Sequence, residues 1–320
     1  MGSAKKVYIS RALPDDVIAP ARAEFDVTVR DNTAPMTVNE VISALQGYDA
    51  ILPTLGDQFS ADVFADAGEI RCKILANFGV GYNHIDVAAA AAHGITVTNT
   101  PGAVTDATAD IAMTLMLMSA RRAGEGERLV RAQKWAGWHP TQLLGLHLSG
   151  KTVGIIGMGR IGQAIARRCH FGFGMDVVYF NRSVKELPFV ATKTATPAAL
   201  AAVVDVVVLA MPGGVETHHF IGADVFSAMK PSAHFINIAR GDIVDEGALM
   251  DALEAGEIAG AGLDVYEFEP QVPERLRVME NVTLLPHMGT AALDVRIGMG
   301  MMAFDNLKTF FDGETPPNCV

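Results

Sequence analysis

Three ionisable side chains, Arg240, Glu269 and His287, stand at or just beyond the ends of apolar stretches in the second half of the chain. A histidine can donate a proton near neutral pH, and a carboxylate beside it favours the charged imidazole. An arginine can bind a carboxylate through two parallel hydrogen bonds and polarise an adjacent carbonyl. Together these groups could assist the reduction of a carbonyl next to a carboxylate, because hydride transfer builds negative charge on the oxygen. Each residue type alone is more often structural, so the inference depends on all three.

A glycine-rich motif, GxGxxG, covers residues 157–162. It follows the apolar segment 152–156 and precedes a predicted helix over 161–168, which is the context that a dinucleotide-binding loop requires. The glycines would allow a tight turn, a close approach of a pyrophosphate to the backbone, and close packing of helix on sheet. The alternative is a glycine turn that binds nothing. The predicted contacts are Gly157, Met158, Gly159, Arg160, Ile161 and Gly162.

The residues after the next predicted strand, Asn181, Arg182 and Ser183, indicate which dinucleotide is used. Sites for NAD usually place Asp or Glu there, to accept a hydrogen bond from the ribose 2′-hydroxyl. Here no carboxylate is present to repel a 2′-phosphate, and Arg182 and Ser183 offer donors. We therefore predict NADP as the preferred cofactor. The alternative is that Arg182 is a solvated loop residue and that NAD is also accepted.

Short apolar segments alternate with alanine-rich helical segments along the whole chain, which predicts two α/β lobes with doubly wound parallel sheets. Runs such as 206–209, all valine and leucine, indicate strands that are buried on both faces. The lobes would join near a long helix over 105–122, and a last helix over 290–311 could return to the first lobe. Predicted strands cover residues 7–10, 25–30, 50–54, 73–78, 95–99, 152–157, 176–181, 203–210, 233–239, 260–265 and 283–286, with further helices at 38–45 and 87–93.

Composition narrows the class of protein. The chain has 320 residues, of which half are hydrophobic and 19% are charged, and its net charge is −11. These values argue against a disordered chain and against a nucleic-acid partner. The longest apolar run, 111–120, is too short to cross a membrane. Cys72, Cys169 and Cys319 form neither a zinc motif nor a disulfide framework, and we expect no signal peptide from the composition of the first residues. We expect a cytoplasmic protein with no metal.

Four segments, 153–162, 237–241, 262–270 and 285–289, resemble the signatures of the D-isomer-specific 2-hydroxyacid dehydrogenases. The resemblance extends over about residues 73–306. It implies that Arg240 anchors the substrate, that His287 is the proton donor or acceptor, and that Glu269 is the partner of His287. It also implies a flavodoxin-like, discontinuous substrate-binding domain over 1–103 plus 292–320, and a Rossmann NADP-binding domain over 104–291. Further cofactor contacts are expected from Thr108, Met211, Pro212, Ile238, Ala239, Arg240, Asp264, His287 and Gly289.

The segment 77–86 resembles the glycine-rich substrate loop of the same family. Gly79 and Gly81 would free backbone N–H groups for a small carboxylate, so Val80 and Gly81 are predicted substrate contacts beside Arg240 and His287. The alternative is a plain strand-to-helix turn, and His84 is expected at the start of a helix. Residues 104–110 resemble the family's crossing into the cofactor domain, with Asp110 where relatives commonly carry Glu.

Within the family, the glyoxylate/hydroxypyruvate reductases are the most similar subgroup, on the basis of residues 135–140, 181–183 and Val80. This resemblance implies a homodimer in which Trp138, on an arm, closes the substrate pocket of the neighbouring subunit. The alternative is that Trp135 and Trp138 are packing residues of the arm.

The function that we predict is the NADPH-dependent reduction of a small 2-oxo acid, with glyoxylate or hydroxypyruvate favoured, to the D-2-hydroxy acid. The two lobes are expected to close on the substrate by a hinge. One alternative is another dehydrogenase of the same fold, acting on phosphoglycerate, formate or a bulkier 2-oxo acid. The other alternative is a dinucleotide-sensing binding module similar to corepressors. Neither a membrane nor a nucleic acid is expected as a partner.

Overall fold

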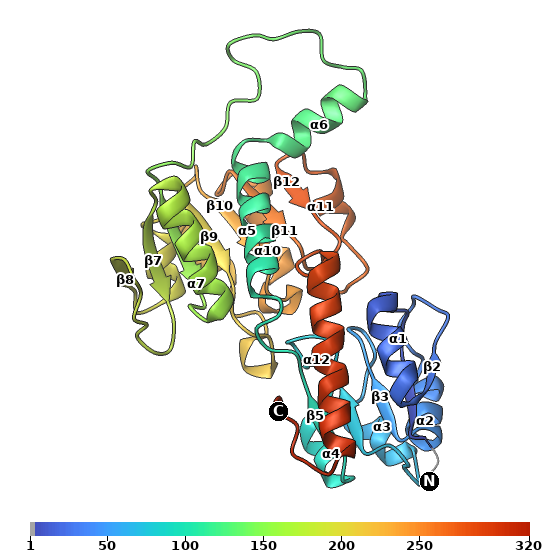
Figure 1. Ribbon diagram of the computed structural model, residues 1–320. Coiled ribbons are helices and arrows are strands. Elements are labelled where there is room, and N and C mark those ends of the chain that lie inside the picture. The colour runs from blue at the N-terminus through green and yellow to red at the C-terminus, as the bar shows by residue number, and fades with distance from the viewer. Residues whose placement is uncertain (1–3) are drawn as a thin grey trace. The chain divides into compact units, whose positions relative to one another are not determined.

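The chain forms two compact units, shown in the computed structural model of Figure 1, which describes residues 4–320. Unit 1 contains the described residues through Val104 together with Ala291–Val320, and unit 2 contains Thr105–Thr290. None of the described helices is both long enough and apolar enough to cross a membrane. Residues 1–3, on which the expectation of no signal peptide partly rests, lie outside the described part.

Unit 1 is built on a five-stranded sheet in the order β2-β1-β3-β4-β5, and all its strand pairs are parallel. The strands are β1 (Lys6–Ile9), β2 (Asp26–Val29), β3 (Ala50–Leu52), β4 (Ile74–Ala76) and β5 (Thr96–Thr98). The helices are α1 (Asp15–Glu24), α2 (Val38–Gly47), α3 (Ala61–Asp66), α4 (Val87–Ala92) and α12 (Leu293–Phe311). Helix α12 packs against α1 and β4, so the last helix belongs to this unit although it is far from it in sequence.

Unit 2 is built on a seven-stranded sheet in the order β12-β11-β10-β9-β6-β7-β8, again wholly parallel. The strands are β6 (Thr152–Ile156), β7 (Asp176–Phe180), β8 (Ala191–Lys193), β9 (Val206–Leu209), β10 (His234–Asn237), β11 (Gly260–Leu263) and β12 (Val282–Leu284). The helices are α5 (Thr105–Ala120), α6 (Ala123–Arg131), α7 (Arg160–Arg167), α8 (Pro197–Ala201), α9 (Ala223–Ala228), α10 (Glu246–Glu254) and α11 (Glu274–Val278), with short turns η1 (Arg168–Gly172), η2 (Val215–Thr217) and η3 (Gly241–Ile243).

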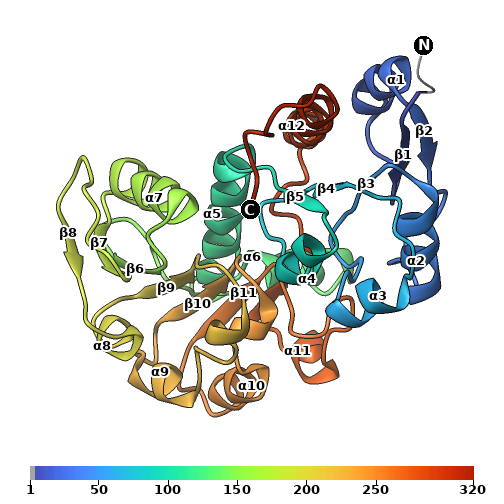
Figure 2. The same ribbon diagram turned by 90° about the horizontal axis from the view of Figure 1, so that it is seen from below.

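The core of unit 2 explains why its strands read as continuous apolar runs. On β9, Val206 and Val208 join one apolar cluster, whereas Val207 and Leu209 join another on the opposite face of the sheet. Helices α5 and α7 cover the first face, and α8, α9 and α10 cover the second (Figure 2). Because both faces are buried, polar residues cannot alternate with apolar ones along the strand. The prediction of two doubly wound parallel-sheet lobes is confirmed.

The sequence pattern predicted the helices and strands themselves better than it predicted the residues at which they begin and end. Strand β9 is shorter than the predicted 203–210, because Val203 stands exposed in the turn before it. Helix α12 begins at Leu293 and not at residue 290. The short edge strand β8, Ala-Thr-Lys, was not predicted, since it has only three residues and its threonine and lysine are exposed.

Candidate active site

The glycine motif lies where a parallel sheet binds nucleotides. It connects β6 to α7, and β6 is the strand at which the order of the sheet reverses. Gly157 has φ +100°, and a side chain there would come within 2.7 Å of the backbone of Ala210. A side chain at Gly162 would overlap the carbonyl oxygen of Gly157. These two glycines are therefore required by the fold of the loop.

Gly159 differs from the other two glycines of the motif, because a Cβ there would have no described atom within 4 Å. The space beside it is open, and helix α7 starts there without a side-chain cap. Uncapped N–H groups at the start of a helix attract a phosphate. The open backbone and the free donors fit the pyrophosphate of a dinucleotide, which Gly159, Arg160 and Ile161 would hold.

Asn181 links this loop to the end of β7. Its Oδ1 accepts from the backbone N–H of Met158 at 3.2 Å, and its Nδ2 donates to the carbonyl and hydroxyl oxygens of Ser183 at 2.9 and 3.2 Å. Arg182 is exposed between them. The side chain of Lys193, from β8, donates to the carbonyl of Arg182 at 3.4 Å, which adds a second positive charge beside the turn.

The predicted catalytic pair is formed. Nδ1 of His287 lies 2.8 Å from Oε2 of Glu269, and both side chains are 29% exposed. The other oxygen of Glu269 accepts from the backbone N–H of Tyr266 at 3.1 Å, and the Glu269–Pro270 peptide is cis. A carboxylate accepts from a protonated Nδ1, so this contact leaves Nε2 of His287 as the nitrogen able to serve a substrate.

The backbone at His287 is held in the left-handed region, at φ +53°. Asp264 fixes it there: its carbonyl accepts from His287 N–H at 2.9 Å, and its carboxylate accepts from Met288 and Gly289 N–H at 2.6 and 2.8 Å. Thr108 Oγ1 then donates to the carbonyl of Gly289 at 3.1 Å. Burial raises the pKa of Asp264 above its usual value, although these donors and the nearby His287 act in the opposite direction. Asp264 and Thr108, predicted as cofactor contacts, thus position the histidine loop.

Tyr266 is a further support of this loop that the sequence reasoning missed. Its hydroxyl donates to the carbonyl of Leu285 at 2.9 Å, so it ties the segment before His287 to the segment before Glu269. Burial, with the carboxylates of Asp264 and Glu269, raises the pKa of Tyr266 well above its usual value. A tyrosine that follows an apolar segment is expected to be a core residue. No local sequence pattern indicates that its hydroxyl would bond to the carbonyl of Leu285.

Arg240 lies on a fixed turn after β10. Asn237 Nδ2 donates to the carbonyl of Arg240 at 3.0 Å, and Asn237 Oδ1 accepts from Ala239 N–H at 3.0 Å. Nη1 of Arg240 donates to the carbonyl of Ala239 at 2.6 Å. Burial lowers the pKa of Arg240, whereas the charges of Glu269 and Asp242 act in the opposite direction. This arginine is thus a partly buried cation with donors left for an anion.

The other predicted cofactor residues of unit 2 also follow the carboxyl ends of strands. Met211 and Pro212 come after β9, and Ile238 and Ala239 come after β10. Strand β9 is hydrogen-bonded to β6, and the phosphate loop packs against the backbone of Ala210 and Met211. These residues therefore share the edge of the sheet that carries the glycine motif.

The predicted substrate loop of unit 1 is a rigid turn. Asn77 Nδ2 donates to the carbonyls of Gly79 and Gly81 at 3.0 Å each, and Asn99 Nδ2 donates to the carbonyl of Val80 at 2.9 Å. The carbonyls are thus engaged, while the N–H groups of Val80 and Gly81 have no acceptor among the described residues. Such an arrangement can bind an anion.

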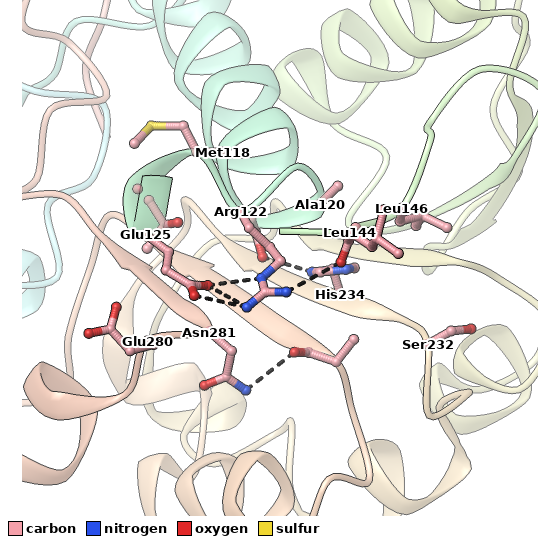
Figure 3. A pocket seen from close by; sticks show the side chains of 15 residues that line it. Met118, Ala120, Arg122, Glu125, Leu144, Leu146, Ser232, His234, Glu280 and Asn281 are labelled. Atoms are coloured by element: carbon pink, nitrogen blue, oxygen red, sulfur yellow. Dashed lines mark hydrogen bonds and ion pairs between the residues drawn. The ribbon is translucent and has the colours of Figure 1, made fainter. Parts of the chain in front are cut away.

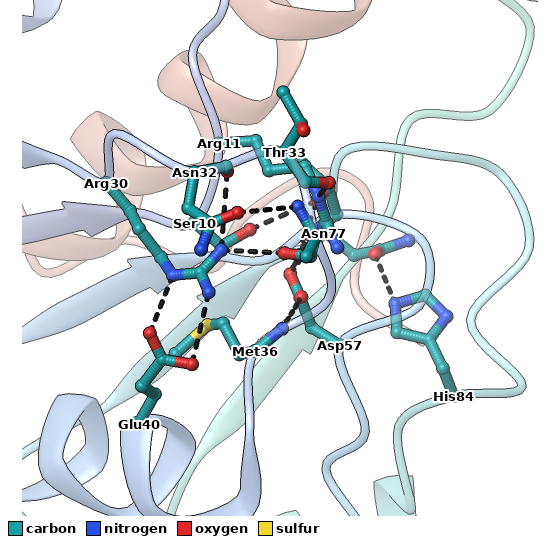
Figure 4. A network of polar contacts seen from close by, with 12 residues as sticks. Ser10, Arg11, Arg30, Asn32, Thr33, Met36, Glu40, Asp57, Asn77 and His84 are labelled. Atoms are coloured by element: carbon teal, nitrogen blue, oxygen red, sulfur yellow. Dashed lines mark hydrogen bonds and ion pairs between the residues drawn. The ribbon is translucent and has the colours of Figure 1, made fainter.

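One sequence prediction in this loop is wrong. His84 does not start a helix, because α4 begins at Val87 with Asp86 as its cap. His84 is instead buried, with Nε2 3.0 Å from Oδ1 of Asn77 (Figure 4). The histidine orients the amide that organises the turn, and only the tertiary fold brings the two residues together.

Beside this turn, the unit 1 network of Figure 4 holds a fully buried carboxylate, Asp57. Asp57 accepts from Arg11 Nη1 at 3.1 Å and from the N–H groups of Met36 and Thr54 at 3.0 Å each. Its charge is therefore satisfied by one cation and two backbone donors, so it serves the loop structure.

Trp138 does not meet the triad in a single chain. It is 78% exposed on the arm 132–147, which follows α6 and projects from unit 2 in Figure 1. Ser119, near the end of α5, is hydrogen-bonded at 2.8 Å to His234, the first residue of β10. The segment that leads through α6 to the arm therefore starts at the amino ends of the strands of unit 2. The triad lies at the carboxyl ends.

A cavity of about 530 Å³ opens at these amino ends, lined among others by Ser119, Arg122, Glu125, His234 and Asn281 (Figure 3). Burial lowers the pKa of His234 to about 4, so this histidine is neutral near pH 7. The cavity is remote from the triad, and none of the predicted site residues lines it.

Comparisons with known proteins show the family of the chain. The family model of the D-isomer specific 2-hydroxyacid dehydrogenase, NAD binding domain, matches residues 113–289. A glyoxylate reductase of Thermococcus gammatolerans is 43% identical over 98% of this chain and 95% of its own length, and a glycerate dehydrogenase of Hyphomicrobium methylovorum is 39% identical over 97% of both. The structure of an NADPH-dependent glyoxylate/hydroxypyruvate reductase from Sinorhizobium meliloti, with NADP and malonate, has TM-score 0.87 at 36% identity, over 99% of this chain and 97% of that one.

The chain belongs to the D-isomer-specific 2-hydroxyacid dehydrogenase family. The predictions of an oxidoreductase with a nicotinamide dinucleotide cofactor, and of similarity to the glyoxylate reductase subgroup, are confirmed.

Proposed function

We propose that the protein reduces glyoxylate or hydroxypyruvate to the D-2-hydroxy acid with NADPH. The observation that carries this proposal is the 2.8 Å contact between His287 and Glu269 on the edge of the sheet that also carries Arg240 and the phosphate loop. A proton donor, an anion anchor and a dinucleotide loop on one edge are what the reduction of a 2-oxo acid requires.

In the reaction, the guanidinium of Arg240 binds the substrate carboxylate and draws charge toward the adjacent carbonyl. Bound NADPH supplies the hydride. His287 donates a proton from Nε2 to the carbonyl oxygen, while Glu269 holds Nδ1 and stabilises the positive charge of the ring. In the reverse direction His287 accepts the proton. Because Arg240 is partly buried, its attraction for the carboxylate is stronger than it would be in water.

The preference for NADPH is proposed from the turn after β7. Arg182 and the hydroxyl of Ser183 would donate to the 2′-phosphate, and Asn181 holds the turn in place. The Sinorhizobium meliloti reductase, which was crystallised with NADP, is a precedent. The cofactor contacts proposed above for Thr108, Met158, Asp264, Gly289 and the residues after β9 and β10 belong to the same proposal.

Two further features are part of the proposal. The free N–H groups of Val80 and Gly81 are donors for the substrate carboxylate, so unit 1 is the substrate-binding domain and unit 2 the cofactor domain. The exposed Trp135 and Trp138 on the arm favour a homodimer in which the arm finds its partner in a second copy. The three cysteines are unpaired, which is compatible with the reducing cytoplasm.

Initial rates with NADPH and with NADH, each against glyoxylate, hydroxypyruvate, pyruvate and phenylglyoxylate, test the proposal. We expect the highest kcat/KM with NADPH and one of the first two acids. His287→Ala is the control and should bind NADPH yet show little turnover. Faster turnover of phenylglyoxylate would instead indicate a dehydrogenase for bulkier acids, and NADPH binding without turnover of any acid would indicate a dinucleotide sensor.

A further inference from the structure

Two histidines and a glutamate that have no role in the proposed reaction meet on the turn after β9 and on the loop that carries Glu269. His218 and His219 follow the turn η2 after β9, and Glu267 lies between β11 and α11. Nε2 of His219 is 2.8 Å from Oε1 of Glu267, and the rings of the two histidines stack with their centroids 3.9 Å apart. One ligand atom from each of the three residues lies within 4.8 Å of the other two.

We propose that His218, His219 and Glu267 bind one divalent transition-metal ion of the zinc class. Two imidazoles and a carboxylate are a ligand set that zinc accepts, with water as the fourth ligand. Imidazole ligands favour zinc, nickel and copper, whereas magnesium and calcium prefer oxygen ligands throughout. Bonds of about 2.0–2.2 Å to one ion require the more distant ligand atoms, which lie up to 4.8 Å apart, to come closer together. His218 can make that movement, because its side chain is exposed.

The segments that carry the ligands are held by backbone contacts. His219 N–H donates to the carbonyl of Asp242 at 2.9 Å, and Glu267 N–H donates to Oε1 of Glu246 at 3.0 Å. Gly241 packs so closely on the chain at Tyr266 and Glu267 that a Cβ there would overlap their backbone. His219 and Glu267 are therefore fixed relative to each other before any ion binds, and such preorganisation strengthens metal binding.

The local charge also favours a cation. Glu246 is buried, and its carboxylate accepts the backbone N–H of Glu267, which is two positions before Glu269. Three acidic side chains thus lie close together, and a divalent ion at Glu267 would reduce their mutual repulsion. The ion would also tie the segment at η2 to the loop that ends in Glu269, and would stabilise that loop without taking part in hydride transfer.

The test is a titration of the chelator-treated full chain with Zn²⁺, followed by calorimetry, and with Co²⁺, followed by its visible absorption. We expect one ion per chain, an increase in Tm with Zn²⁺, and no saturable binding of Mg²⁺. His218→Ala and Glu267→Gln should each weaken zinc binding about tenfold or more. His139→Ala, which removes an exposed histidine of the arm, is the matched control and should bind zinc as the wild type does.

Two results would overturn the proposal: no saturable Zn²⁺ binding by the wild type, or unchanged affinity in His218→Ala. The exposed His218 makes no contact that the fold needs, so this variant decides the question even if Glu267→Gln fails to fold. Turnover of His218→Ala in the presence of chelator should equal that of the wild type, which separates the metal site from the catalytic site.

Discussion

Single contacts determine what each reactive side chain can do. The carboxylate of Glu269 engages Nδ1 of His287, so the ring leaves its other nitrogen for the proton transfer that we propose. Asp264 then holds the backbone at His287 in a conformation that a residue with a side chain rarely adopts. A mutation of Asp264 would therefore act on catalysis through the position of the histidine.

Removal of the Arg240 guanidinium tests whether this residue binds the substrate carboxylate. Each charge-assisted hydrogen bond to a carboxylate is worth about 1.5–3 kcal/mol, so Arg240→Ala should lower kcat/KM by one to several decades, at about 1.4 kcal/mol per decade. Steady-state kinetics with glyoxylate measure this loss. Arg240→Lys should recover only part of it, because lysine cannot form the bidentate pair. Near-normal efficiency of the alanine variant would remove Arg240 from the mechanism.

Replacement of Arg182 tests the discrimination between cofactors. Arg182→Ala should weaken NADPH binding about tenfold while NADH binding changes little, because only NADPH carries the 2′-phosphate. Fluorescence titration of the two nucleotides gives both values of Kd. Arg167→Ala on α7 removes the same charge from another exposed position and serves as the control. Equal weakening of NADPH and NADH would contradict the proposed role.

The buried His234 predicts a dependence of stability on pH. Its folded pKa of about 4 lies below the ordinary value of 6.5, so between these values the unfolded chain binds a proton that the folded chain does not. The free energy of unfolding should therefore fall as pH decreases from about 6.5 to 4, by on the order of 3 kcal/mol from this group. Urea unfolding at several pH values should show a smaller fall for His234→Asn than for the wild type. Parallel pH curves would show that His234 does not titrate in this way.

At the scale of elements, the residues of the proposed site lie on loops after strands, and the strands fix where those loops begin. Register explains the proximity: β9 pairs with β6 and with β10, so the ends of the three strands lie side by side. The phosphate loop, the turn at Met211 and the turn at Arg240 are consequently neighbours. Gly157 and Gly162 serve the packing of these loops, whereas Gly159 leaves space for a ligand.

This difference between glycines can be measured. Gly159→Ala should fold with nearly unchanged stability but bind NADPH and NADH more weakly, since its methyl group enters the open space. Gly162→Ala should lose stability, by about 1–3 kcal/mol for an overpacked site, because its methyl group meets the backbone of Gly157. Thermal unfolding and nucleotide titration of both variants separate the two effects. Normal nucleotide binding by Gly159→Ala would contradict a pyrophosphate at this position.

At the scale of the whole molecule, the chain carries surface that its own units do not cover. The arm exposes Trp135 and Trp138 at 52% and 78%, although tryptophan is mostly buried in a folded monomer. In the homodimer that we propose, a second copy of the chain would cover these side chains.

Loss of both tryptophans should therefore weaken the homodimer. The double variant Trp135→Ser, Trp138→Ser should shift toward the monomer in light scattering coupled to size-exclusion chromatography, because it removes the large apolar side chains from the arm. Val215→Ser, at an exposed apolar position away from the arm, is the control. A wild type that is monomeric at all concentrations would contradict the homodimer, and an unchanged dimer in the variant would contradict the role of the tryptophans.

The sequence by itself determined the class of fold and indicated most of the residues that we propose to be reactive. Local composition reports burial, so the runs of valine, leucine and isoleucine marked the strands. The glycine spacing and the polar residues after strands indicated the proposed phosphate loop and the proposed triad, because ligands of parallel sheets bind at the carboxyl ends of the strands.

Only the tertiary structure decided which residues support the reactive ones. Asn77 with His84, Tyr266 with Leu285, and His219 with Glu267 are pairs separated by 7, 19 and 48 positions, and no local pattern relates them. Hydrogen bonds of this kind depend on the positions of loops that the sheet brings together. His84 shows why local sequence is not sufficient. Its neighbours in sequence indicated the start of a helix, whereas the fold buries it against the side-chain amide of Asn77.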